Sequence, residues 1–125
     1  YVESENNLSQ DGNCWIYDKA IVYDDAKVFG SARIYDSAQV SGSADIYGSA
    51  KVHGSAAVSD NAIVYGSARV SGFAVVSNKA DVYGAAIISG SARISGYVIM
   101  SGFARISGSV RISGTSEISG SARIF

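Results

Sequence analysis

Residues 31–36 read S-A-R-I-Y-D and residues 91–96 read S-A-R-I-S-G, and this six-residue unit is the feature from which the fold can be predicted. From Cys14 to Phe125 every residue falls into the same register without an insertion or a deletion. The fourth position is always Val, Ile or Met, and the second is nearly always Ala. Apolar positions spaced by two lie on one face of a β-strand, whereas a helix needs apolar spacings of three and four. The unit therefore predicts very short strands that share one apolar interior.

The sixth position of the unit holds only Gly, Asp or Asn, and thirteen of the fourteen glycines lie there. These three residue types share a tolerance of positive φ, so the chain is expected to turn a corner every six residues. Strands this short cannot pair with their sequence neighbours across such a corner. Each strand must instead pair with one that lies a full coil away, which predicts a solenoid.

The register over residues 14–125 resembles the hexapeptide-repeat family, whose left-handed parallel β-helix has three six-residue sides per coil. The leader from Glu3 to Trp15 is also similar to that of uncharacterised repeat proteins of bacteria and phages, some of which are labelled as transferases. The resemblance implies an all-β, single-stranded, left-handed parallel β-helix with three faces and about six coils of 18 residues. The left hand comes from the family alone, because the general rule for parallel crossovers favours the right hand.

Two regions are expected, namely an N-terminal cap over residues 1–13 and the β-helix over residues 14–125. Leu8 and Trp15 are predicted to cover the first coil. Although 47% of the residues are apolar, they form no long continuous run, so we expect no membrane span. Cys14 is the only cysteine and occupies an inward alanine position, so we expect a small core residue and no internal disulfide.

Residues 18 apart should lie on neighbouring coils, and one outer face then carries a column of cations. This basic face consists of Arg33, Lys51, Arg69, Arg105 and Arg123, with Trp15 and Ile87 in the same column. Like charges stacked on adjacent strands repel, which suggests an anionic partner such as a phosphate, an acidic glycan or an acidic protein surface. Long side chains that extend separately into water are the alternative. The net charge of -1 argues against nucleic acid as the partner.

A second face carries an aromatic ladder beside carboxylates. Its rings are Phe29, Tyr47, Tyr65 and Tyr83. Such rings could bind sugars, but identical neighbours also stabilise a parallel sheet by themselves.

The third face carries serines every 18 residues from Ser41 to Ser113. Ice-binding solenoids usually use threonine at such positions, so ice binding is not favoured. Three apolar residues, Phe73, Tyr97 and Phe103, are expected at corners, where they could form a patch for a protein partner or another copy of the chain.

Catalysis is the rival prediction, because many members of the resembled family are trimeric acyltransferases with a histidine at the subunit interface. His53 is the only histidine, and it could serve as a general base near Tyr35. An uninterrupted repeat supplies no loop to build a pocket wall, however, so a non-catalytic structural or binding solenoid is favoured and a degenerate acyltransferase is the alternative. We expect no cofactor, and no metal site either, because turn conformation explains Asp18, Asp24 and Asp25.

The charge is polarised along the chain. Residues 1–62 hold nine acidic and four basic side chains, net -5, whereas residues 63–125 hold two acidic and six basic ones, net +4. The repeat continues to Ile124 and Phe125 with its core pattern unbroken. We therefore expect the basic C-terminal end to be an uncapped association surface for a following domain, a partner or a second copy.

Overall fold

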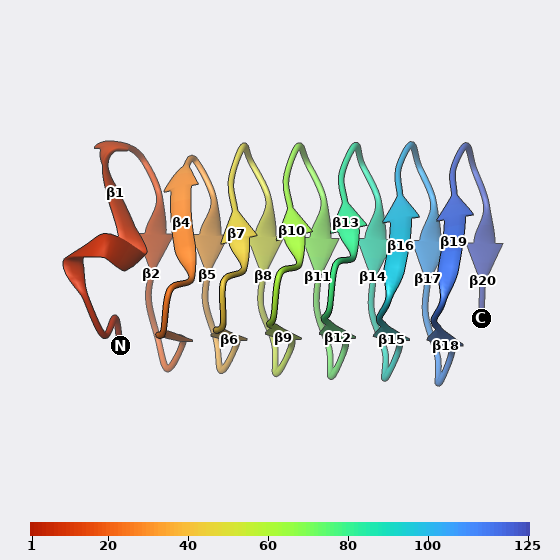
Figure 1. Ribbon diagram of the computed structural model, residues 1–125, viewed down its shortest axis with the longest axis horizontal. Coiled ribbons are helices and arrows are strands. Elements are labelled where there is room, and N and C mark those ends of the chain that lie inside the picture. Colours follow the sequence, from red (N-terminus) through yellow and green to blue (C-terminus); the bar gives the residue numbers. More distant parts are fainter.

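The chain forms a parallel β-solenoid of about six 18-residue coils, as the sequence predicts (Figure 1). This computed structural model describes the backbone of residues 1–125 and the side chains of residues 1–8 and 13–125. Three parallel sheets, of seven, seven and six strands, run the length of the solenoid, and the two ends of the chain lie at opposite ends of the long axis (Figure 1). Within the described residues, the only helical segment is the 3-10 turn η1, Glu5–Asn7.

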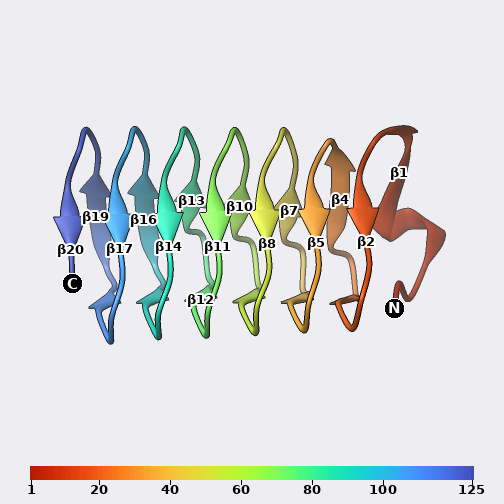
Figure 2. The same cartoon turned by 180° about the vertical axis from the view of Figure 1, so that it is seen from behind.

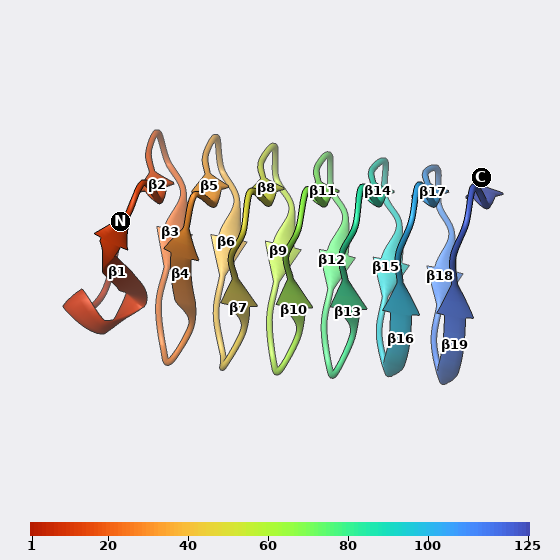
Figure 3. The ribbon, with the colours of Figure 1, turned by 90° about the horizontal axis from the view of Figure 1, so that it is seen from above.

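Each sheet takes one strand from every coil. Sheet A contains β3 (Ile21–Val22), β6 (Gln39–Val40), β9 (Ala57–Val58), β12 (Val75–Val76), β15 (Arg93–Ile94) and β18 (Arg111–Ile112). Sheet B contains β1 (Leu8–Gly12), β4 (Lys27–Gly30), β7 (Asp45–Ile46), β10 (Ile63–Val64), β13 (Asp81–Val82), β16 (Tyr97–Met100) and β19 (Thr115–Ile118). Sheet C contains β2 (Trp15–Ile16), β5 (Arg33–Ile34), β8 (Lys51–Val52), β11 (Arg69–Val70), β14 (Ile87–Ile88), β17 (Arg105–Ile106) and β20 (Arg123–Ile124). Sheet C faces the viewer in Figure 2, and Figure 3 shows the strands of sheet A in one row along the axis.

The register of the sheets is set by the 18-residue coil. Val64, for example, pairs with Ile46 in the preceding coil and with Val82 in the following one. Apolar side chains at the second and fourth positions of the unit point inward, and from Ala20 to Ile106 they are completely buried. Alanine at alternate inward positions allows three sheets to approach closely and to fill the interior at the density of a protein core. In the last coil the inward residues Val110, Ile112, Ala122 and Ile124 are only partly buried.

The corners have the positive φ that the sequence predicts. Asp18, Asp24, Asp36, Asp60 and Asn78 have φ between 56° and 59°, and the glycines at the same register position lie in the same left-handed region. Gly42 shows a second reason for glycine, because a Cβ there would come within 2.7 Å of the backbone nitrogen of Asp60. Successive coils therefore leave little room for a Cβ at this corner.

The corner aspartates also form hydrogen bonds between coils. The Oδ2 atoms of Asp24, Asp36 and Asp60 accept hydrogen bonds from the backbone N–H groups of Gly42, Gly54 and Asn78, at 3.2, 3.0 and 3.1 Å. In each case the donor lies at the same corner one coil further along the chain. An aspartate here therefore supplies an acceptor that glycine lacks.

The N-terminal segment bonds to the backbone of the first coil. Tyr1 and Glu3 donate backbone hydrogen bonds to Ala20 and Val22, and Val22 N–H donates to the Tyr1 carbonyl. The buried amide of Asn7 donates to the carbonyls of Asp24 and Ala26 at 3.0 and 2.8 Å. These contacts satisfy groups that would otherwise be unpaired at the start of a solenoid.

Side chains in the predicted cap behave differently from one another. Leu8 is partly buried and packs against the core. Trp15, by contrast, is 60% exposed and does not cover the first coil as predicted, because it occupies the outward position of β2 opposite Arg33. The side chains of residues 9–12 lie outside the described residues.

Candidate functional site

The basic face lies on sheet C, and its residues are paired across neighbouring strands. Lys51 pairs with Arg33 on one side and Arg69 on the other, and Arg105 pairs with Arg123. Ile87 separates the two groups of cations, as the column spacing predicts. In the part of the chain that the structure describes, no carboxylate lies within 4.0 Å of these cations. Their charge is therefore available to an anionic partner.

The aromatic ladder lies at the outer side of sheet B and its rings stack directly. The ring centroids of Phe29 and Tyr47 are 4.7 Å apart, and those of Tyr47–Tyr65 and Tyr65–Tyr83 are 4.9 Å apart, with interplanar angles of 4° to 9°. Partial burial raises the pKa of the Tyr65 hydroxyl, as do the neighbouring Tyr47 and Tyr83 hydroxyls and Asp81. Burial also raises the pKa of the Asp81 carboxyl beside the ladder. These rings present their edges as a continuous ridge along the solenoid.

A second ladder of stacked rings, which follows the strands of sheet C, was not predicted from the sequence. Tyr17 stacks on Tyr35 with a centroid distance of 5.1 Å, and Tyr35 stacks on His53 at 4.7 Å. Desolvation is the main reason that the pKa of the Tyr35 hydroxyl is raised. The 18-residue spacing of these three residues was the signal that could have identified the ladder. These three residues directly follow β2, β5 and β8, so this side of the solenoid combines stacked rings with the cations of sheet C.

His53 is the one residue that suggests catalysis. Its Nδ1 atom lies 3.9 Å from Oδ2 of Asp36, the same oxygen that accepts a hydrogen bond from Gly54 N–H. Partial burial lowers the pKa of His53, Asp36 opposes that shift, and Arg69 and Lys51 add to it. The lowered pKa favours the neutral imidazole, the state in which a general base can accept a proton. Its ring is stacked on Tyr35 at the edge of a flat face, and the three hollows described below are lined by other residues.

The predicted apolar corners do not form one patch. Phe73 follows β11 at the corner between sheets C and A, Tyr97 begins β16 at the corner between sheets A and B, and Phe103 lies between sheets B and C. All three are strongly exposed, at 59% to 70%. Phe103 contributes with Ile87 and Ala85 to a hollow of about 330 Å³ between Arg69 and Arg105. This part of the basic face is therefore apolar at its centre and cationic at both sides.

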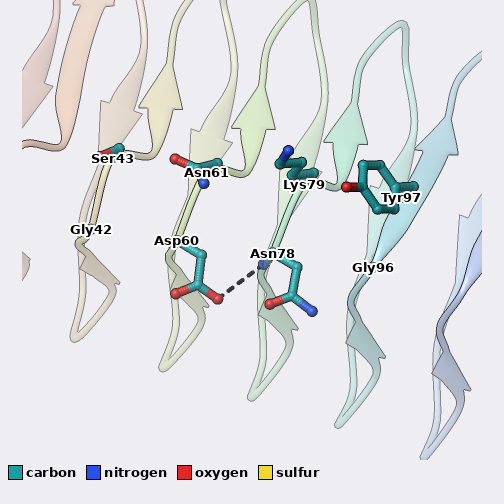
Figure 4. Close-up of a pocket in the computed structure, with 8 residues that line it drawn as sticks. All are labelled: Gly42, Ser43, Asp60, Asn61, Asn78, Lys79, Gly96 and Tyr97. Carbon is teal, nitrogen blue, oxygen red and sulfur yellow. Dashed lines mark hydrogen bonds between the residues drawn. The ribbon is translucent and has the colours of Figure 1, made fainter.

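A shallow groove follows the corner between sheets A and B. It has a volume of about 580 Å³ and crosses four coils, and its lining residues form two rows (Figure 4). The upper row is Ser43, Asn61, Lys79 and Tyr97, and the lower row is Gly42, Asp60, Asn78 and Gly96 (Figure 4). The sequence analysis identified only Tyr97 among these residues. A second hollow, of about 870 Å³, lies at the N-terminal end and includes Glu5, Asp24, Asp25 and Asp45 in its lining.

In residues 1–8 and 13–125 no three His, Cys, Asp or Glu side chains come close enough to hold a metal ion together. Asp24 is occupied by the hydrogen bond to Gly42, and Cys14 is partly buried against the core. Across the same residues no helix is long and apolar enough to cross a membrane.

The fold and the surface together define a β-solenoid repeat protein. A family model described as the YdcK beta-solenoid repeat matches residues 56–72, a segment of roughly one coil, so the chain is similar to that repeat over this stretch. A search of curated proteins finds no match to the chain.

Proposed function

We propose that this protein is a non-catalytic solenoid that associates with a protein or glycan partner through its outer surfaces. The observation that carries the proposal is the regular placement of functional side chains. Arg33, Lys51 and Arg69 pair across adjacent strands, and stacked rings run along both sheet B and sheet C. A flat surface with a repeated charge and ring pattern is suited to holding an extended partner, whereas catalysis needs groups that converge on one enclosed point.

The two ends of the solenoid differ in charge, and this difference suggests how the protein associates. The N-terminal hollow is lined by Glu5, Asp24, Asp25 and Asp45, whereas the last coils expose Arg105, Arg111 and Arg123. Opposite charges at the two ends favour head-to-tail contact between copies, or contact of the C-terminal end with an acidic partner. Such contacts weaken as salt screens the charges.

Two measurements test the proposal. The first is sedimentation velocity at low and high salt, where self-association should be stronger at low salt. The second is binding to an array of acidic and uncharged oligosaccharides. A double variant of the basic face, Arg33→Ser with Lys51→Ser, should weaken binding to an acidic partner. The control, Arg93→Ser on sheet A with Lys27→Ser on sheet B, removes the same charge from the other two faces and should not. A chain that stays monomeric at both salt concentrations and binds nothing on the array would contradict the proposal.

The alternative function is a hexapeptide-repeat, acyltransferase-like protein, and the observation in its favour is that Nδ1 of His53 lies 3.9 Å from Oδ2 of Asp36, with the pKa of His53 lowered by partial burial. In that case His53 would take a proton from a hydroxyl or amine that attacks the carbonyl carbon of an acyl thioester. The carbon–sulfur bond would then break, and the leaving thiolate would take up that proton. Incubation with acetyl-coenzyme A and a set of amine and hydroxyl acceptors would reveal the activity. Transfer that disappears in a His53→Ala variant would favour this alternative over the binding solenoid.

A further inference from the structure

We propose that the corner between sheets A and B, from Ser43 to Tyr97, is a binding site for an uncharged oligosaccharide that lies along the solenoid axis. The inference rests on the proposed binding function and assigns to it a place and a ligand class. The site is the groove of about 580 Å³ shown in Figure 4.

The first argument is the distribution of departures from the repeat. Ser is the most common residue at the first position of the six-residue unit, which lies at a corner. At the corner between sheets A and B this position reads Asp25, Ser43, Asn61, Lys79, Tyr97 and Thr115, so five of six residues depart from Ser. At the corner between sheets C and A only Lys19 and Phe73 depart among six. Because serine satisfies the same corner elsewhere, departures gathered on one line indicate a role other than folding.

The second argument is that two side chains in the lower row of the groove are held in place by hydrogen bonds. Asp60 Oδ2 accepts a hydrogen bond from Asn78 N–H at 3.1 Å. In the amide orientation that satisfies both partners, Asn78 donates to Asp60 Oδ2 at 3.0 Å and accepts from Gly96 N–H at 3.2 Å. These bonds fix the two side chains in the lower row before any ligand binds, which lowers the entropic cost of binding.

The third argument is the chemistry of the upper row. Ser43, Asn61 and Lys79 are exposed and offer hydroxyl, amide and ammonium groups. Tyr97 is 59% exposed, and its hydroxyl end points toward Lys79, whose Nζ lies 5.2 Å from the ring centroid (Figure 4). Lys79 covers one face of this ring, so a sugar would contact the part of the ring that stays exposed. Donors and acceptors beside an exposed aromatic ring match a sugar, which has hydroxyl groups around its rim and C–H groups on its faces.

The charge of the groove and the spacing of its lining residues favour an extended, uncharged ligand. The Asp60 carboxylate and the Lys79 ammonium offset one another, so the groove offers no net attraction to an anion, unlike the basic face on sheet C. Equivalent groups recur once per coil, at a strand spacing of about 4.8 Å, so the lining extends over about 14 Å from Ser43 to Tyr97. An extended chain of uncharged sugars therefore fits the groove better than a single sugar or an acidic polymer.

The experiment uses arrayed oligosaccharides of glucose, mannose, galactose and N-acetylglucosamine, from one to six sugars, with polygalacturonate fragments as the acidic comparison. We expect binding of at least one uncharged series, with an affinity that rises with length. Tyr97→Ser and Asn61→Ser each restore the residue most common at this position, and each should weaken binding by about tenfold, as expected for loss of an anchor residue. Phe73→Ser is the matched control, because it removes an equally exposed ring from another corner.

The outcomes separate this inference from the proposed function. Loss of binding in Tyr97→Ser but not in Phe73→Ser, with unchanged melting temperatures, supports the groove. Sugar binding that survives Tyr97→Ser but is lost in Tyr65→Ser, or binding of acidic fragments alone, overturns the inference and leaves the binding solenoid in place. Binding of a protein partner at this corner without any binding of sugars would also overturn the assigned ligand class.

Discussion

The carboxylate of Asp60 accepts a hydrogen bond at 3.1 Å from the backbone N–H of Asn78, which occupies the same corner one coil further along. Asp60 thus has two structural roles, because it also adopts a φ of 58°. Three substitutions separate these roles. Asp60→Asn should remain near wild-type stability, since asparagine tolerates this φ and keeps an acceptor. Asp60→Gly should lose only the acceptor, and Asp60→Ala should be the least stable, by about 1–2 kcal/mol, because it loses both. Chemical denaturation checks the order, and an Asp60→Ala variant as stable as Asp60→Asn would contradict it.

Val64 tests the interior. It is completely buried between Ile46 and Val82, so Val64→Asp places a carboxylate where no partner is available. We expect a loss of at least about 4 kcal/mol or failure to fold. Val75→Asp is the matched control, because Val75 occupies the outward position of β12 and should cost less than about 1 kcal/mol. Thermal melting followed by circular dichroism distinguishes the two, and similar melting temperatures would mean that the inward assignment is wrong.

Tyr65 tests the aromatic ladder, because it stacks on both Tyr47 and Tyr83. Tyr65→Ser should destabilise the fold by about 1–3 kcal/mol, since two ring contacts are lost. Tyr23 has the same position in the repeat, but the residue one coil further is Ser41 rather than a ring. Tyr23→Ser should therefore cost clearly less in the same urea titration. Equal losses would show that the stacking itself contributes nothing.

His53 tests both the alternative function and the effect of pH on stability. Its pKa is lowered in the folded state, so between the folded and unfolded values the unfolded chain binds more protons. Stability contributed by the neutral imidazole is present above the unfolded value, near 6.5, and is lost as pH falls through the lower folded value. Wild type should therefore lose melting temperature relative to His53→Gln between pH 7.5 and pH 5. The effect should be small because the side chain is partly exposed. A difference that grows in the opposite direction would contradict the assigned shift.

Asn7 tests the proposal that residues 1–13 are an N-terminal cap. Its amide donates to Asp24 and Ala26 in the first coil, and its Oδ1 accepts from Ser4 N–H. Asn7→Ala leaves these buried groups unpaired and should cost about 1–3 kcal/mol. Asn6→Ala, at the exposed neighbour, should have little effect. Hydrogen exchange should show faster exchange in the first coil of Asn7→Ala, and unchanged protection there would contradict the cap.

The sequence predicted the columns well because a single spacing determines them. Once 18 residues make a coil, the pairing of Lys51 with Arg69 and the stacking of Tyr47 on Tyr65 follow from the numbering alone. The spacing also places Trp15 in the outward column of the basic face, and the separate expectation that Trp15 covers the first coil was wrong because it disregarded that column. The corner groove was missed because the corner residues were considered one at a time, and only the apolar ones were singled out. Residues 18 apart at the same corner were not compared with one another. The left hand of the coil stays a prediction, since the same periodicity suits either hand.

The interior of this solenoid repeats every six residues, whereas its exterior repeats every eighteen. A gain or loss of six residues would place each later Val or Ile in an equivalent buried position, so the core would accept the change. The same event would move every later residue onto the next side of the prism, separating Lys51 from Arg69 and Tyr47 from Tyr65 if it fell between them. The requirement to fold therefore does not by itself keep outward residues that are 18 apart aligned on neighbouring coils. Only selection on the outward columns can preserve this alignment, and what such selection would leave are columns that keep the eighteen-residue spacing, as Arg33, Lys51 and Arg69 do and as the rings from Phe29 to Tyr83 do.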